Sequence, residues 1–161
     1  MIPCAEFADI KESRVLLGLD DQDLERLAAQ CELRTMAEGT TVFIENMPGE
    51  SLFIVKTGAI RVSRMFAEAD EKTLLVLGPG DVFGEMAVID GLPRSATARV
   101  AEDARLICLG KPAFDKLVGE CPETALKIVM NLTRVFIKRV RDAQDDYREM
   151  LSWAMQPVEK G

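Results

Sequence analysis

The sequence predicts an α+β fold that is mainly β: an antiparallel β-roll or jelly-roll barrel with one N-terminal helix and two C-terminal helices, the last one long. Three observations predict this fold. Short apolar runs alternate with turn residues through 32–110, as in small antiparallel barrels. Apolar residues at helical spacing precede this stretch, and a longer helical pattern follows it. A chain of 161 residues is long enough to bury the core of one such domain.

The whole chain, 1–161, is interpreted as a single domain with three consecutive parts. The first part contains Asp20 and Asp21, either of which is a suitable helix N-cap, and Leu24 then begins an apolar repeat at helical spacing. The predicted parts are a helical region at 10–31, a β-roll at 32–110 and two helices within 111–155.

The β-roll is predicted from β-rich runs bounded by turn residues. Asn46–Gly49, Gly58 and Gly78–Asp81 are turn signals, and the polar stretch Glu68–Glu71 reads as the tip of a hairpin. We expect each turn to separate two short strands. The strands expected from these boundaries are 41–44, 51–55, 59–63, 73–77, 96–100 and 105–109.

Two helices are predicted after the roll. The first is short, at 112–118, and Pro122 is suited to the first position of a second helix that continues to about Ala154. A helix of that length spans roughly 48 Å, more than a small roll can cover. We therefore expect its distal part either to pair with a second copy or to pack within the chain. The apolar stripe expected to do so is Val129, Leu132, Phe136, Val140, Ala143, Tyr147, Met150 and Ala154.

Composition excludes several classes of function. The chain contains no histidine, which excludes Ser-His-Asp and Cys-His catalysis and removes the commonest metal ligand. We therefore expect no enzyme activity, no metal and no resident cofactor. The formal net charge of -7 disfavours nucleic-acid binding. No apolar run approaches the length that spans a bilayer, so no membrane partner is expected.

The cysteines indicate a compartment. Four are present, none forms a CxxC pair, and their spacing fits neither a zinc site nor a dense disulfide framework. We interpret them as reduced thiols of a cytoplasmic protein. They are Cys4, Cys31, Cys108 and Cys121.

The segment from Gly80 to Val100 carries the strongest chemical signal. Gly84 permits a tight turn, and residues 85–89 then form one helical turn whose first N–H groups lack partners, as in anion sites. Arg94 follows a second turn and precedes small residues, and a guanidinium is suited to bidentate contact with a phosphate. Glu85 would repel a phosphate, but it suits a ligand that also carries a hydroxyl donor.

Two parts of this segment, Phe83-Gly-Glu-Met-Ala87 and Arg94-Ser-Ala-Thr97, stand six residues apart. Together they resemble the phosphate-binding cassette of cyclic-nucleotide-binding domains, a family that includes the catabolite activator protein, the regulatory subunits of protein kinase A and cyclic-nucleotide-gated channels. The resemblance implies that Glu85 accepts the ribose 2′-OH, and that Arg94 and Ser95 bind the phosphate. It also implies that backbone N–H groups complete the cradle at Gly84, Met86, Ala87 and Ala96.

The resemblance implies a base pocket as well. Leu75, Leu77 and Phe83 would flank the base inside the roll. The lid in this family comes from the last helix, where Phe136, Arg139 and Val140 are the candidates. Arg139 has an alternative interpretation, because it could instead only solvate the surface of the helix.

We therefore expect a cytoplasmic regulatory module for signal transduction that binds a cyclic nucleotide and transmits occupancy through its C-terminal helices. Ser95 stands where a threonine favours cyclic GMP in the family, so cyclic AMP is expected first, cyclic GMP second and a cyclic dinucleotide last. The expected macromolecular partner is a second copy of the chain, or an unknown effector protein, at the last helix. The alternative is a degenerate family member that acts as an assembly module without binding nucleotide.

Overall fold

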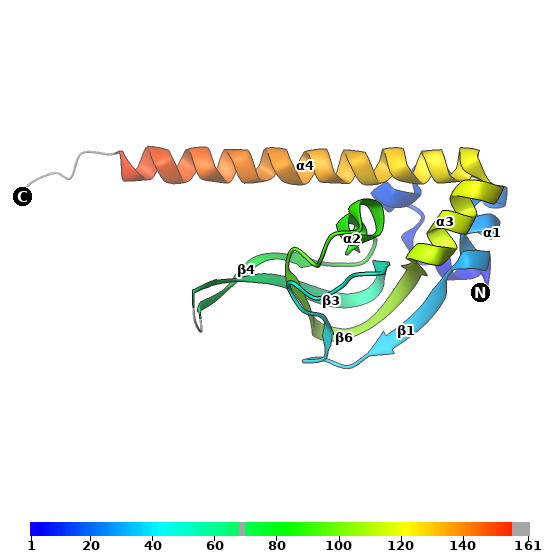
Figure 1. Cartoon of the computed structure of the whole chain (residues 1–161), viewed down its shortest axis with the longest axis horizontal. Coiled ribbons are helices and arrows are strands. Elements are labelled where there is room, and N and C mark those ends of the chain that lie inside the picture. Colours follow the sequence, from blue (N-terminus) through cyan, green and yellow to red (C-terminus); the bar gives the residue numbers. More distant parts are fainter. Residues whose placement is uncertain (68–69, 156–161) are drawn as a thin grey trace, which may run out of the picture.

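The computed structural model describes residues 1–67 and 70–155. One β-sheet and several helices make up this part of the chain (Figure 1). The helices are two 3₁₀ turns, η1 (Cys4–Ile10) and η2 (Arg14–Leu16), and α1 (Asp21–Gln30), α2 (Glu85–Asp90), α3 (Lys111–Glu120) and α4 (Pro122–Ala154). The strands are β1 (Glu32–Met36), β2 (Thr41–Phe43), β3 (Ser51–Ala67), β4 (Asp70–Leu77), β5 (Val82–Phe83) and β6 (Thr97–Gly110).

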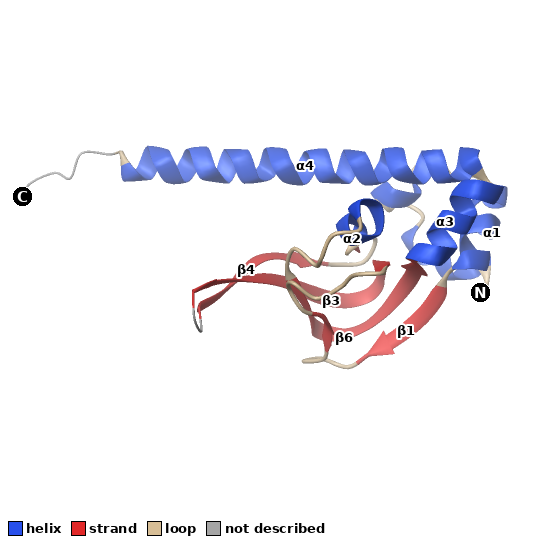
Figure 2. Cartoon of the chain, viewed as in Figure 1, coloured by secondary structure: helices blue, strands red, loops and turns tan. Residues whose placement is uncertain are grey.

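The strands form one antiparallel sheet that curls into a roll (Figure 2). The order β1-β6-β3-β4 runs across it, β2 adds to β6, and β5 adds to β3. Helices flank the roll at one end, and α4 runs along one side of it (Figure 2). The α+β prediction of a mainly antiparallel roll, with helices before and after it, is confirmed.

The central strands are longer than the sequence predicted. Gly58 does not end a strand, because β3 continues through it from Ser51 to Ala67. Gly58 instead lies at irregularities of the β3–β6 pairing, with a φ of 84°, and a Cβ there would come within 2.3 Å of Asp103 O. The predicted strands 96–100 and 105–109 likewise belong to the single strand β6. Of the predicted hairpin tip, residues 68–69 lie outside the described residues.

The N-terminal region contains more helix than its periodicity indicated. Asp20 is the N-cap of α1, and its side chain and that of Asp23 form a reciprocal capping box. Before α1, η1 and η2 pack their apolar residues into the core, with Phe7 fully buried and Val15 nearly so. Short 3₁₀ turns have too few residues to show a helical repeat, so the sequence did not predict them.

Two clusters of buried residues form the core. One lies inside the roll, and the other lies where η1, η2, α1, α3 and the first half of α4 meet the sheet. Leu132 is the last buried residue of α4, and Val135 and Arg139 are the only described residues after it that are not exposed. The distal half of α4 therefore runs beside the roll, along the β3–β4 hairpin, without burying its side chains against it (Figure 1). The two buried cysteines, Cys31 and Cys108, are core residues, and all four thiols are free.

Candidate functional site

Gly84 connects β5 to α2 and makes the tight turn that the sequence predicted. Its φ is 75°, which favours glycine. A Cβ at this position would lie 2.8 Å from Arg94 Nη1 and 3.0 Å from Ser51 O, so no larger residue fits without displacing the arginine. α2 begins directly afterwards at Glu85. The turn thus brings the start of α2 and the Arg94 side chain together.

Arg94 is held inside the cassette. Its backbone N–H donates to Met47 O, and its carbonyl accepts from the N–H of Asn46, which fixes the start of the segment returning to β6. The side chain is only 6% exposed, and Nη1 donates to Gly84 O at 3.0 Å. Its guanidinium carbon lies 4.1 Å from the centre of the Phe43 ring.

The charge of Arg94 has no partner. Among the described residues no carboxylate forms a salt bridge with it, and its buried Nε has no hydrogen-bond acceptor. Burial lowers the pKa of the Arg94 guanidinium from its ordinary value, but an arginine remains protonated at neutral pH. The nearby Glu85 carboxylate raises this pKa in part, but it forms no salt bridge with Arg94. A buried cation without a bonded counter-ion is costly, and the arrangement therefore fits an anionic ligand.

Glu85 does have a partner. It is 7% exposed, and its Oε1 accepts from Arg139 Nη1 at 3.2 Å. The other amino group of Arg139 donates to Val82 O. These bonds connect α4 to both sides of the Gly84 turn. The alternative that Arg139 only solvates the helix surface is therefore wrong.

The remaining cassette residues lie around this pair. Ser95 is exposed. Among the described residues, the only side-chain hydrogen bond of its hydroxyl is to the Met86 sulfur, at 3.7 Å. Ala87 and Ala96 are buried beside the turn. Phe83 is buried too, in an aromatic cluster with Phe43 and Phe53. All of these residues except Phe53 line one cavity with Gly84, Glu85, Met86 and Arg94.

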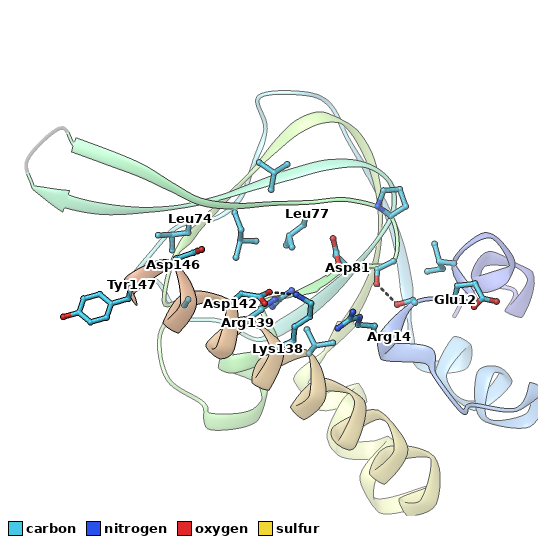
Figure 3. Close-up of a pocket in the computed structure, with 18 of the residues that line it drawn as sticks. Glu12, Arg14, Leu74, Leu77, Asp81, Lys138, Arg139, Asp142, Asp146 and Tyr147 are labelled. Carbon is cyan, nitrogen blue, oxygen red and sulfur yellow. Dashed lines mark hydrogen bonds and ion pairs between the residues drawn. The ribbon is translucent and has the colours of Figure 1, made fainter. Parts of the chain in front are cut away.

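The cassette cavity is small and adjoins a larger groove. Its volume is about 190 Å³, below the roughly 300 Å³ at which ligand pockets begin. The groove beside it has a volume of about 1160 Å³ and lies between β4 and α4 (Figure 3). Both share Leu74, Leu75, Leu77 and Arg139, so the cassette opens into the groove. We assign the candidate site to the smaller cavity, despite its size, because the unpaired Arg94 lines it and does not line the groove.

The predicted base pocket is only partly assembled. Leu75 and Leu77 line the cavity, as does Phe136 of α4, which is 46% exposed. Val140 lines neither the cavity nor the groove and is exposed on another face of α4. The cavity is therefore lined by the charged side chains of Arg94, Glu85 and Arg139 and by an apolar set that includes Leu75, Leu77 and Phe136.

Three lining residues were missed from the sequence: Phe43, Val62 and Leu74. Phe43 and Val62 belong to runs that were predicted as strands, so their strand positions were available. Nothing in the sequence indicated which strand would approach the cassette.

Comparison with known proteins assigns the family. The family model for the cyclic nucleotide-binding domain matches residues 33–121, more than half of the chain. This chain belongs to the cyclic nucleotide-binding domain family. The matched range runs from the second residue of β1 to just beyond the end of α3 and contains the whole cassette, including Glu85 and Arg94. The family predicted from the cassette residues is confirmed.

Individual relatives agree with this family. The chain is 31% identical over 134 residues to a cyclic AMP receptor protein of Thermus thermophilus, covering 83% of this chain and 60% of that protein. It is 32% identical to a cAMP-dependent protein kinase regulatory subunit of Debaryomyces hansenii, covering 68% of this chain and 24% of that one. The chain thus spans at most about three-fifths of these relatives.

Solved structures show the same fold. A cyclic nucleotide-binding domain from Methylobacillus flagellatus superimposes with a TM-score of 0.81 at 25% identity, covering 88% of this chain and 83% of that one. The catabolite activator protein of Thermus thermophilus superimposes with a TM-score of 0.75 at 30% identity, covering 87% and 63%. Within the described residues of this chain, no helix is long and apolar enough to cross a membrane, and no acidic or cysteine cluster could hold a metal ion.

Proposed function

We propose that this chain is a regulatory module that binds cyclic AMP, and cyclic GMP second, in the cassette cavity. The observation that carries the proposal is the buried, unpaired guanidinium of Arg94 beside the start of α2. A cyclic phosphate supplies the single negative charge that this cation lacks. Exposed Ser95 and the first N–H groups of α2 are placed to share the phosphate oxygens.

The rest of the cavity supports a nucleotide rather than a simple anion. Glu85 uses only Oε1 for Arg139, which leaves Oε2 to accept a ribose hydroxyl. Leu75, Leu77 and Phe136 form an apolar surface suited to the faces of a purine. We place cyclic AMP before cyclic GMP because Ser95, not threonine, follows the arginine. The relatives named above for cyclic AMP add support to this order.

Occupancy would be transmitted through α4. The ligand contacts Glu85 in this proposal, and Glu85 is bonded to Arg139 of α4. A ligand can shift α4 only by the difference in its affinity for the two arrangements, and a shared carboxylate provides such a difference. The module is proposed to act in the cytoplasm and not as an enzyme, since its site contains no histidine or nucleophile-base pair.

We further propose that α4 pairs with α4 of a second copy. One face of α4 shows an exposed repeat with steps of four and three residues, the spacing of a coiled-coil seam. It faces away from Ile128, Leu132 and Val135, which pack on the chain's own body. All positions of this α4 seam except Thr133 and Gln144 are apolar or aromatic. They are Leu126, Met130, Thr133, Ile137, Val140, Gln144, Tyr147 and Leu151.

The seam differs from the stripe predicted from the sequence. Of that stripe, Leu132 is buried in the chain's own core and Val129 packs against it, so the proximal stripe packs within the chain. Val140 and Tyr147 belong to both sets. In this proposal Val140 belongs to the seam, consistent with its absence from the lining of the cavity and the groove.

Titration calorimetry tests the nucleotide proposal. We expect wild-type protein to bind cyclic AMP at micromolar concentration or below, and cyclic GMP more weakly. Arg94→Ala removes the charge-assisted bonds to the phosphate, and the affinity should fall about a hundredfold for bonds of roughly 3 kcal/mol. Arg99→Ala is the matched control, because Arg99 lies on the same segment but pairs with Glu71 outside the cavity. A folded wild-type protein that binds neither nucleotide would instead be the degenerate assembly module or would take a cyclic dinucleotide, which a third titration distinguishes.

A further inference from the structure

The side chain that holds Arg94 is an aromatic ring. Phe43 on β2 lies under the guanidinium, with 4.1 Å between the guanidinium carbon and the ring centre. The face of a phenyl ring attracts a cation through its quadrupole and accepts no conventional hydrogen bond. Phe43 therefore attracts Arg94 without neutralising its charge or occupying its N–H donors.

The ring is itself fixed in place. Its centre lies 5.8 Å from that of Phe83 and 6.1 Å from that of Phe53, and the latter two rings are 5.2 Å apart. Phe43 also pairs with the buried residue Ala98 of β6. A Cβ placed on Gly84 would come within 3.3 Å of the Phe43 ring edge, so the ring packs against the cassette turn. Its orientation is thus set by the roll.

Gly49 also packs closely against Arg94. A Cβ on Gly49 would lie 2.6 Å from Arg94 Nε and 2.8 Å from its Cδ. With Gly84 O accepting from Nη1, the side chain is confined by a glycine, a carbonyl and a ring, and among the described residues it forms no salt bridge with an acidic residue. An acidic partner would have to be displaced by an incoming phosphate, whereas a ring would not.

We propose that Phe43 is a positioning residue that holds the Arg94 guanidinium, still fully charged, ready for the phosphate of the ligand. The proposal rests on the proposed nucleotide function for the identity of the anion. The contact between Phe43 and Arg94 does not depend on it. Holding the side chain before binding removes the cost of ordering it when the ligand arrives.

Two variants separate positioning from core packing. Phe43→Leu removes the ring, and Phe43→Tyr retains it. We expect Phe43→Leu to weaken cyclic AMP binding about tenfold and Phe43→Tyr to keep wild-type affinity within about threefold. In an Arg94→Gln background, which lacks the cation that the ring attracts, Phe43→Leu should have little further effect on the remaining affinity. Equal losses from Phe43→Leu in both backgrounds would show a packing role only and overturn the proposal.

A measurement without ligand separates this proposal from the nucleotide proposal. In the free protein we expect the NMR signal of Arg94 Nε–Hε to be shifted by the Phe43 ring and protected from exchange with water. The shift and the protection should persist in Phe43→Tyr and disappear in Phe43→Leu, or in Phe43→Met if the leucine variant does not fold. An unchanged Arg94 signal in the variant would overturn the proposal, whether or not wild-type protein binds nucleotide.

Discussion

Arg94 favours binding of the proposed ligand but lowers the stability of the folded protein. The residue is 6% exposed and carries an unpaired charge, which the folded state tolerates at a cost in free energy. Replacing it by an apolar side chain of similar length removes that cost. Function therefore accounts for a residue that stability alone would exclude.

We predict that Arg94→Met raises the free energy of unfolding by about 1 kcal/mol while it weakens cyclic-nucleotide binding about a hundredfold. Chemical denaturation without ligand measures the first effect, and calorimetry measures the second. Arg99→Met is the control, since Arg99 is partly exposed and already paired with Glu71, and its loss should bring no gain in stability. A less stable Arg94→Met would mean that the cassette needs this cation to fold.

The cassette residues could be predicted because their information is local. Gly84, Glu85 and Arg94 lie within eleven consecutive residues, and the turn chemistry of that stretch indicates its geometry. The contacts made by Phe43 and Arg139 could not be predicted in this way. Each depends on how a distant strand or helix is rotated against the cassette, and tertiary packing sets that rotation.

At the scale of elements, the same limit explains the differences in the sheet. Gly58 has the signature of a turn, and only its partner strand decides that it forms an irregularity within β3 instead. For α4, the sequence predicted both bounds. It did not predict which face is buried, because both apolar faces repeat at steps of three and four residues. One face of α4 is buried because η2, α1 and α3 pack against it, and the α4 seam lies on the face that they do not cover.

The seam makes a prediction about assembly. Wild-type protein should be a dimer in sedimentation experiments, because a seam from Leu126 to Leu151 extends about 38 Å. Ile137→Asp places a charge at its centre and should give a monomer that retains its helix content. Glu149→Lys is the matched control on the same helix, off the seam, and should remain dimeric. A dimeric Ile137→Asp protein would show that the dimer interface does not lie at the α4 seam.

At the scale of the whole molecule, α4 is anchored at one end and connected to the cassette further along. The anchor is the nearly buried Asp23 of α1, which accepts from Thr124 at 2.6 Å and pairs with Lys127. Asn131 donates to the carbonyl of Val15 within η2 and to that of Leu17 directly after it. Beyond these contacts only Arg139 joins α4 to the cassette by hydrogen bonds among the described residues. Ligand-driven movement should therefore occur around Arg139, not at the anchor.

Arg139→Ala tests this arrangement. The variant leaves Glu85 buried without its cation, so the carboxylate should repel the phosphate, and cyclic AMP affinity should fall about tenfold. In wild-type protein, hydrogen exchange at 135–143 should respond to the nucleotide, whereas exchange at 122–132 should not. The response at 135–143 should vanish in Arg139→Ala and persist in Lys138→Ala, because Lys138 pairs within α4 with Asp142. A wild-type response in Arg139→Ala would mean that occupancy reaches α4 by packing against Phe136 rather than through the Glu85 carboxylate.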